Sequence, residues 1–201
     1  MKNRIYQLIF VLLLISTFSM YSADNKQGKV FADLLTESKM VFQMPNGLVE
    51  ATIVDNDQMH YEFAIKYPDK KFEIRYSIRP LRGMIDQYKE NEKNKKAGDV
   101  FLDPNKFYSS SFQAVAINIS GGRFGGKKEF DKSSVQKEFN ADWGATTFVE
   151  TGKAFGQGYK YCMMVAIHKD DCADAYIFFM TDDKEHLMEL AMPAFYSLKF
   201  K

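Results

Sequence analysis

The side chains most able to do chemistry gather in one short segment of the C-terminal half. His168, Asp170, Asp171, Cys172 and Asp174 fall within seven residues. Nitrogen, oxygen and sulfur ligands together suit zinc, and three carboxylates suit calcium. Their spacing matches no established metal loop, however, and a hairpin turn also favours aspartates. We therefore expect a solvated hairpin tip here, with His168, Asp170, Asp171 and Asp174 as the alternative metal ligands.

A glycine-rich segment, Gly121 to Lys128, partly matches a phosphate-binding loop. Gly121, Gly126 and Lys127 fit the pattern G-x-x-x-x-G-K, but Lys128 stands where a Ser or Thr must hold magnesium. A phosphate loop also follows a strand, whereas the residues before Gly121 have helical spacing. The segment therefore predicts a helix stop and a connector, with no bound nucleotide and no cofactor.

Candidate nucleophiles lack the partners that would activate them. Cys162 belongs to an apolar strand, where a thiol is usually inert, and Ser109–Ser111 lack the glycine-flanked elbow of hydrolases. Neither His60 nor His186 forms a group with a nucleophile. Asn118 begins a glycosylation sequon, but it adjoins the apolar stripe of a helix. We expect no catalytic residue; a metal-dependent or hydrolytic enzyme is the alternative.

Two alternating segments around Pro68-Asp69 predict a hairpin. Met59 to Tyr67 and Phe72 to Ile78 each place apolar residues on one face. Pairing Tyr67 with Phe72 sets Lys66 across from Glu73, so the register and the charges agree. Shorter strands are expected at 40–43 and 48–54, and later strands at 145–150, 159–168 and 175–181.

Four helices are expected around these strands. The first begins at Pro80, with Leu81, Met84, Ile85 and Tyr88 on one stripe. The second begins at Asp103-Pro104 and ends at Gly121, the third opens with a capping box at Ser133 and Gln136, and the last is capped near Thr181 or Asp182.

The last two long strands are apolar on both faces. Met163 and Met164 point to opposite sides of the same strand, and Ile177 to Met180 run without a polar residue. Such strands are covered on both sides. The sequence therefore predicts an α+β fold, a single antiparallel sheet with helices on both faces. The alternative is a sheet covered on one face only, as in lipocalin-like or cystatin-like folds.

The two cysteines are expected to be unbonded. Cys162 lies near the far end of its strand and Cys172 in the turn. Eight residues at about 3.3 Å each separate them by about 25 Å, whereas a disulfide needs Cα atoms within about 7 Å.

The N-terminus has the layout of a secretory signal peptide. Lys2 and Arg4 precede the apolar run Leu8 to Ile15, which is too short to span a membrane. Cleavage is expected after Ser19, with later positions up to Ala23 as alternatives. We therefore expect a secreted or periplasmic protein without a stable membrane span.

The remaining chain, residues 24–201, is expected to form a single globular domain. Hydrophobic residues make up 46% of the sequence, enough for a packed core. Lys+Arg (27) and Asp+Glu (26) nearly balance, and loss of the leader would leave one more acidic than basic residue. This balance does not favour nucleic acid as a partner.

The order of strands, a helical middle, three strands and a final helix resembles the PsbP-like α/β/α sandwich, a group that includes the periplasmic DcrB-like proteins. The segments that carry the resemblance are 145–150, 158–161, 175–179 and 197–200. The likeness is one of element order over most of the chain, and it implies a fold more than a function.

These features together favour a non-catalytic exported module that binds another envelope component or a small ligand. The surfaces expected to be free for a partner are the loops 121–128 and 152–158 and the charged face of the helix that begins at Asp103-Pro104.

Overall fold

The computed structural model describes residues 26–201, so the expected leader of residues 1–19, and cleavage sites up to residue 23, lie outside the described residues. The described chain has an α+β fold. Its helices are α1 (Lys26–Glu37), α2 (Arg82–Lys93), α3 (Tyr108–Ile119), α4 (Lys132–Phe139), α5 (Lys153–Gly156) and α6 (Leu187–Ala191), with 3-10 turns η1 (Pro104–Lys106) and η2 (Met192–Ala194).

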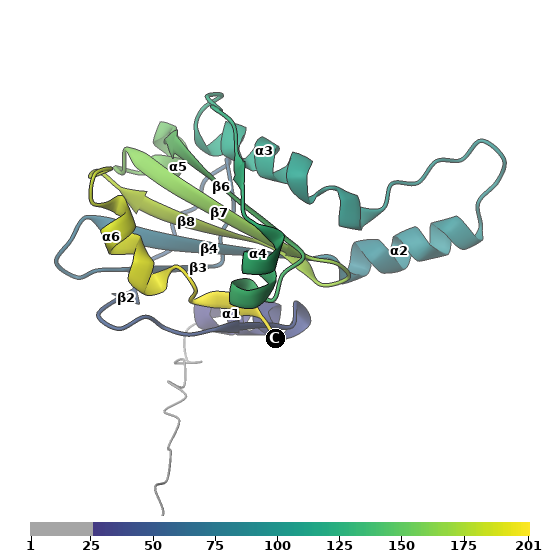
Figure 1. The fold of residues 1–201 in the computed structure, drawn as a ribbon, viewed down its shortest axis with the longest axis horizontal. Coiled ribbons are helices and arrows are strands. Elements are labelled where there is room, and N and C mark those ends of the chain that lie inside the picture. The colour runs from purple at the N-terminus through teal and green to yellow at the C-terminus, as the bar shows by residue number, and fades with distance from the viewer. Residues whose placement is uncertain (1–25) are drawn as a thin grey trace, which may run out of the picture.

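Seven strands form the main antiparallel sheet, in the order β2-β3-β4-β8-β7-β6-β5. The long strands β4, β8, β7 and β6 occupy its middle (Figure 1). The strands of the fold are β1 (Met40–Phe42), β2 (Val49–Glu50), β3 (Phe63–Lys66), β4 (Phe72–Pro80), β5 (Lys128–Glu129), β6 (Trp143–Glu150), β7 (Tyr161–Lys169), β8 (Ala173–Thr181) and β9 (Leu198–Phe200).

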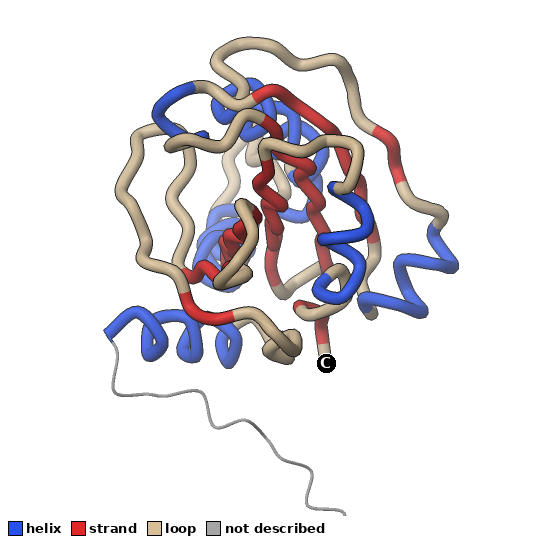
Figure 2. The backbone as a smooth tube through the Cα atoms, turned by 90° about the vertical axis from the view of Figure 1, so that its left-hand side faces the viewer, coloured by secondary structure: helices blue, strands red, loops and turns tan. Residues whose placement is uncertain are grey.

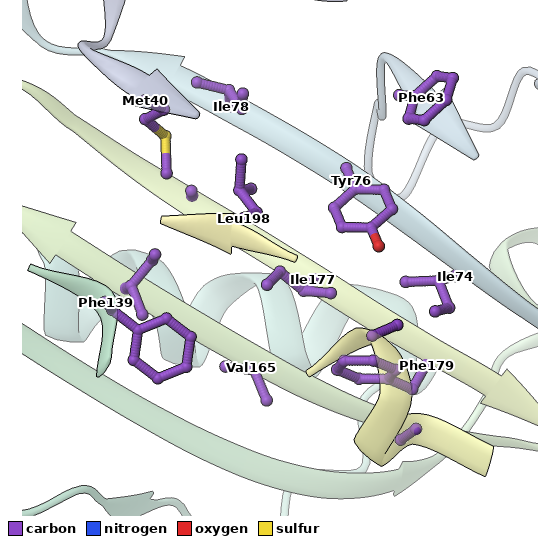
Figure 3. Packing of buried hydrophobic residues seen from close by; sticks show 14 of the residues in the cluster. Met40, Phe63, Ile74, Tyr76, Ile78, Phe139, Val165, Ile177, Phe179 and Leu198 are labelled. Atoms are coloured by element: carbon purple, nitrogen blue, oxygen red, sulfur yellow. The ribbon is translucent and has the colours of Figure 1, made fainter. Parts of the chain in front are cut away.

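Apolar side chains cover both faces of the sheet, and helices lie on both sides of the strands (Figure 2). One face packs against α1, α4 and α6 and includes Met163 (Figure 3 shows part of this layer). The other face packs against α3 and α5 and includes Met164. Both methionines are buried, which confirms the expected two-sided burial and contradicts the alternative of a sheet covered on one face.

The predicted β3–β4 hairpin has the expected register, with Ile65 opposite Ile74 and Lys66 opposite Glu73. The prediction that Met59 and Tyr61 share the face of Phe63 is wrong, because they pack in the opposite layer. Glu62 N–H donates to Tyr76 O at 2.9 Å, although Tyr76 is already paired with Phe63. Two residues therefore oppose one, as in a β-bulge, and the extra residue reverses the alternation.

The sheet is not the only one among the described residues. Strands β1 and β9 form a separate antiparallel pair, with Met40 opposite Phe200 and Phe42 opposite Leu198. The expectation of a single sheet is therefore wrong. Both strands are three residues long, and they pair across almost the whole chain, so local periodicity contains no signal for their pairing.

Several helix boundaries differ from those expected because another residue provides the cap. Pro80 is the last residue of β4, and α2 begins two residues later. Asp131, rather than Ser133, caps α4 by accepting a hydrogen bond from the Ser134 N–H at 3.1 Å. Helix α6 begins at Leu187 and not near Thr181. Helix α3 agrees best with the expected apolar stripe, because Phe112 and Ile119 of that stripe are buried.

Two helices were not expected. Helix α1 precedes the first predicted element, and α5 occupies part of the predicted loop 152–158. Helix α2 differs in another way, because only Ile85 of its residues is buried and Met84 is exposed. Figure 1 shows α2 and the segment after it extending away from the sheet.

Both cysteines are free and buried. Cys162 is paired with Met180 in the β7–β8 ladder, and Cys172 lies in the turn between these strands. The two cysteines therefore lie at opposite ends of β7, as expected. Burial raises the pKa of the Cys162 thiol well above its usual range, so the thiol is a packing group.

Candidate functional site

The residues proposed as metal ligands do come together, but they bind one another. His168 is buried, and its Nδ1 lies 2.7 Å from Asp174 Oδ1 while its Nε2 lies 2.9 Å from Asp170 Oδ1. Both ring nitrogens are therefore occupied by carboxylates. Within residues 26–201 no group of three or more His, Cys, Asp or Glu side chains has the geometry to hold a metal ion.

Asp171, the fourth candidate ligand, points to a different part of the chain. Its carboxylate accepts a hydrogen bond from Asn105 Nδ2 at 3.3 Å, and its N–H donates to Asn105 Oδ1 at 3.0 Å. On the other side of the turn, the Leu81 N–H donates to Cys172 O at 2.9 Å. The β7–β8 turn is therefore held between the start and the end of the projecting segment that contains α2. The turn is the expected hairpin tip, with Asp170 and Asp171 exposed, and it also anchors the projecting segment.

The imidazole of His168 is further fixed by the aromatic ring of Tyr108, whose centroid lies 4.4 Å away in a stacked arrangement. Burial opposes the charged form of the imidazole, but the hydrogen bonds to Asp174 and Asp170 outweigh it and raise the pKa of His168. The protonated ring, with one N–H for each carboxylate, is the form that this geometry favours.

We expect His168 to make stability depend on pH. Because its pKa is raised in the folded protein, its contribution is complete below the unfolded value of about 6.5 and is lost as pH rises through the folded value. Urea unfolding at pH 6 and pH 9 should show that the wild type loses more stability than His168→Gln. His186, whose pKa Asp183 also raises, cancels in this comparison. Equal losses in the two proteins would contradict this role of His168.

The other chemical candidates of the sequence are also engaged in structural contacts. Lys127 forms an ion pair with Glu129 at 2.7 Å and donates to the hydroxyl of Ser109. It is therefore not held for a phosphate, and the glycine segment follows helix α3 rather than a strand. His60 lies 3.7 Å from Glu62, and His186 lies 2.7 Å from Asp183. Neither histidine is paired with a nucleophile.

A surface hollow of about 530 Å³ lies where β6 ends and β7 begins. It adjoins both loops that the sequence marked as free for a partner. Its lining residues are Arg123, Glu150, Thr151, Lys153, Gln157, Gly158, Tyr159, Lys160 and Tyr161.

Two glycines bring the walls of the hollow together. The Gly152 N–H donates to Ile119 O at 2.7 Å, and a Cβ on Gly152 would lie only 3.2 Å from the nitrogen of Gly121. Gly121 itself has φ +65°, a conformation that glycine adopts without strain. The buried Ser120 hydroxyl then accepts a hydrogen bond from the Arg123 N–H at 3.0 Å. These contacts place Arg123 beside the connection between β6 and β7.

The opposite wall is formed by α5 and the start of β7. The Thr151 hydroxyl donates to Tyr159 O, and Gln157 ends α5 in the left-handed conformation. Burial, opposed in part by Arg75, raises the pKa of Tyr159 to about 12, so this phenol stays neutral. The ring of Tyr161 stacks on Phe148 at 5.6 Å. The wall therefore offers neutral aromatic surface beside its charges.

The hollow carries an excess of positive charge. Arg123, Lys153 and Lys160 line it together with one carboxylate, Glu150. Among the ion pairs of residues 26–201, none involves any of these four side chains. The geometry thus suits a ligand that brings negative charge.

A second hollow of about 340 Å³ differs in this respect. Its Lys71 and Asp182 form an ion pair at 2.5 Å, and its His186 and Asp183 pair at 2.7 Å. Four of its charged side chains are thus paired with one another, and Lys70 and Glu189 add one charge of each sign, so the hollow has no excess of positive charge and makes a weaker case for an anionic ligand.

Sequence reasoning identified the two loops but not the hollow between them. The residues from Tyr159 to Tyr161 were expected only as part of a strand, and Lys153 only as part of a loop. The signal that was available is the pair of glycines, Gly121 and Gly152, but their contact joins residues 31 positions apart.

Comparisons of the sequence with protein families and with curated proteins give no match. In the described part of the chain, no helix is both long enough and apolar enough to cross a membrane.

Proposed function

We propose that this chain is an exported, non-catalytic binding module with the PsbP-like α/β/α architecture, and that the hollow at the connection from β6 to β7 binds an anionic partner or ligand. The proposal of export depends on the leader-like N-terminus, which favours a secreted or periplasmic location. Helices on both faces of the antiparallel sheet are compatible with the proposed architecture.

The observation that carries the binding proposal is the excess of positive charge in the hollow, whose cations form no ion pair among the described residues, although Asp182 nearby attracts Lys160. Three cations, Arg123, Lys153 and Lys160, line one concave surface, and the single carboxylate there does not neutralise them. Tyr159 and Tyr161 add apolar surface and hydroxyl groups, as is common in ligand sites. The alternative, a metal-dependent or hydrolytic enzyme at His168, has less support because Asp170 and Asp174 occupy both ring nitrogens.

Inorganic pyrophosphate and citrate are suitable probes, measured by isothermal titration calorimetry. We expect both to bind, with affinity that falls as salt screens the charges. Lys153→Glu should weaken binding by at least about tenfold, equivalent to about 1.4 kcal/mol.

The matched control is Lys132→Glu. Lys132 is also exposed and is also the first residue of a helix, but it lies in α4, which packs against the opposite face of the sheet. The Lys132→Glu variant should bind the probes with the affinity of the wild type. Equal weakening in both variants would assign binding to net charge alone, and the absence of binding to the wild type would contradict the proposal.

A further inference from the structure

The outer edge of β6 is left without backbone partners over part of its length. In an antiparallel ladder, the N–H and C=O of a residue point to the same side and successive residues alternate. The Thr151 N–H donates to Lys160 O, toward β7, whereas the Gly144 carbonyl accepts from the Phe130 N–H on the outer side. The even-numbered residues of β6 therefore face outward.

Two of these outward residues are not paired. Thr146 is opposite Lys128 of β5, and Gly152 donates to Ile119 O. Between them, Phe148 and Glu150 form no backbone hydrogen bond on this side with any residue from 26 to 201. The stretch from Thr146 to Gly152 measures about 20 Å at about 3.3 Å per residue, which is room for a short strand.

The chain leaves this edge at Gly126. With φ +111°, Gly126 turns its carbonyl to the hydroxyl of Thr147 at 2.7 Å instead of to the Phe148 N–H. The loop has open space beside three of its glycines, because a Cβ at Gly122, Gly125 or Gly126 would meet no atom within 4 Å, although Phe124 between them packs against the core. The open edge is therefore flanked by a glycine loop with free space around it.

The open edge and the cationic hollow are continuous. Glu150 belongs to both, and Arg123 lies in the loop that leaves the edge. The side chain of Phe148 is 46% exposed beside them. Unpaired strand groups are matched best by another peptide backbone, and the three cations are matched by carboxylates.

We propose that an extended, acidic segment of another protein adds to β6 at Phe148 and Glu150 and places its carboxylates against Arg123, Lys153 and Lys160. This inference rests on the proposed function and names the chemistry of its partner. A second copy of this chain fits less well, because it would bring the same three cations to the same edge.

The test begins with a phage-displayed library of random 12-residue peptides selected on the mature protein. The selected sequences should be rich in Asp and Glu and poor in Pro. A synthetic peptide of the strongest sequence should slow amide exchange at Phe148 and Glu150 by at least about tenfold in NMR measurements. Unchanged exchange at both amides, or selection of basic sequences, would overturn the inference.

Two pairs of variants make the test specific. Phe148→Pro removes an outward N–H while leaving the β7 ladder intact, and it should bind the peptide at least about tenfold more weakly than Phe148→Thr, which keeps that N–H. Lys153→Glu should weaken binding similarly, and Lys132→Glu should not. Equal affinity of the two Phe148 variants would overturn edge pairing. If Phe148→Pro does not fold, amide exchange at Phe148 and Glu150 of the wild-type protein with bound peptide decides whether the edge is paired.

The failure of this inference can be told from the failure of the proposed function. If pyrophosphate binds but no acidic peptide protects the edge, the hollow is an anion site and the strand addition is wrong. If neither binds, both are wrong. Exchange at Phe148 that slows as the concentration of the protein alone increases would identify a second copy as the occupant.

Discussion

Replacing Glu73 with Leu is expected to destabilise the fold by about 3–5 kcal/mol, because it leaves a guanidinium buried without its counter-charge. Arg75 is 1% exposed, and its Nε donates to Glu73 Oε1 at 2.6 Å. Its Nη1 donates to the carbonyl of Phe155, and its guanidinium lies 5.0 Å from the rings of Tyr61 and Phe155. The cation is therefore surrounded by protein, and water cannot replace the lost carboxylate.

The double variant Glu73→Leu with Arg75→Met should be more stable than Glu73→Leu alone. It removes both charges, and its main remaining cost is the unsatisfied Phe155 carbonyl, about 1–3 kcal/mol. Urea unfolding followed by circular dichroism measures both. The exposed pair Lys71–Asp182 provides the control, since Lys71→Met should cost at most about 1 kcal/mol. Additive effects of the two changes at 73 and 75 would show that the pair is not coupled.

Phe31→Ala is expected to destabilise the protein by about 3–5 kcal/mol. Phe31 is 1% exposed, and its ring lies 4.7 Å from that of Phe63 and 5.4 Å from that of Phe42. It is a fully buried side chain by which α1 enters the core layer shown in part in Figure 3, and Leu34 and Leu35 of the same helix pack against that layer while partly buried. Removing it leaves a cavity between the helix and the sheet.

The neighbouring residue supplies the control for this prediction. Val30 lies in the same helix but is 44% exposed, so Val30→Ala should change stability by at most about 0.5 kcal/mol. The same unfolding measurement compares the two variants. A similar small effect for both would mean that α1 is not an integral part of the fold.

The amino-acid sequence by itself determined the features that depend on short-range pattern. The alternation around Pro68-Asp69 was enough to predict the register of β3 with β4, including Lys66 opposite Glu73. The continuous apolar run in β8 was enough to predict burial on both faces of the sheet. In the hairpin, side chains alternate with a period of two and only one register buries the apolar set. In β8, an uninterrupted apolar run has to be covered on both faces.

Tertiary structure decided which polar groups found partners. The sequence placed His168 close to Asp170, Asp171 and Asp174, but only the folded chain turns Asp171 to Asn105 and leaves both ring nitrogens of His168 to the other two. Arg75 occupies a position in β4 that periodicity alone assigns to a polar face, and its burial depends on α5, which covers it.

The hollow and the open edge of β6 are also products of long-range packing. Gly121 and Gly152 must lie in contact for Arg123 and Lys153 to line the same hollow, and Gly126 must leave the ladder for Phe148 to remain unpaired. Hydrophobic periodicity indicates which face of an element is buried, because every residue of a buried face tends to be apolar. It does not record which distant element supplies the cover, so sites formed where separate segments meet are visible only in the folded protein.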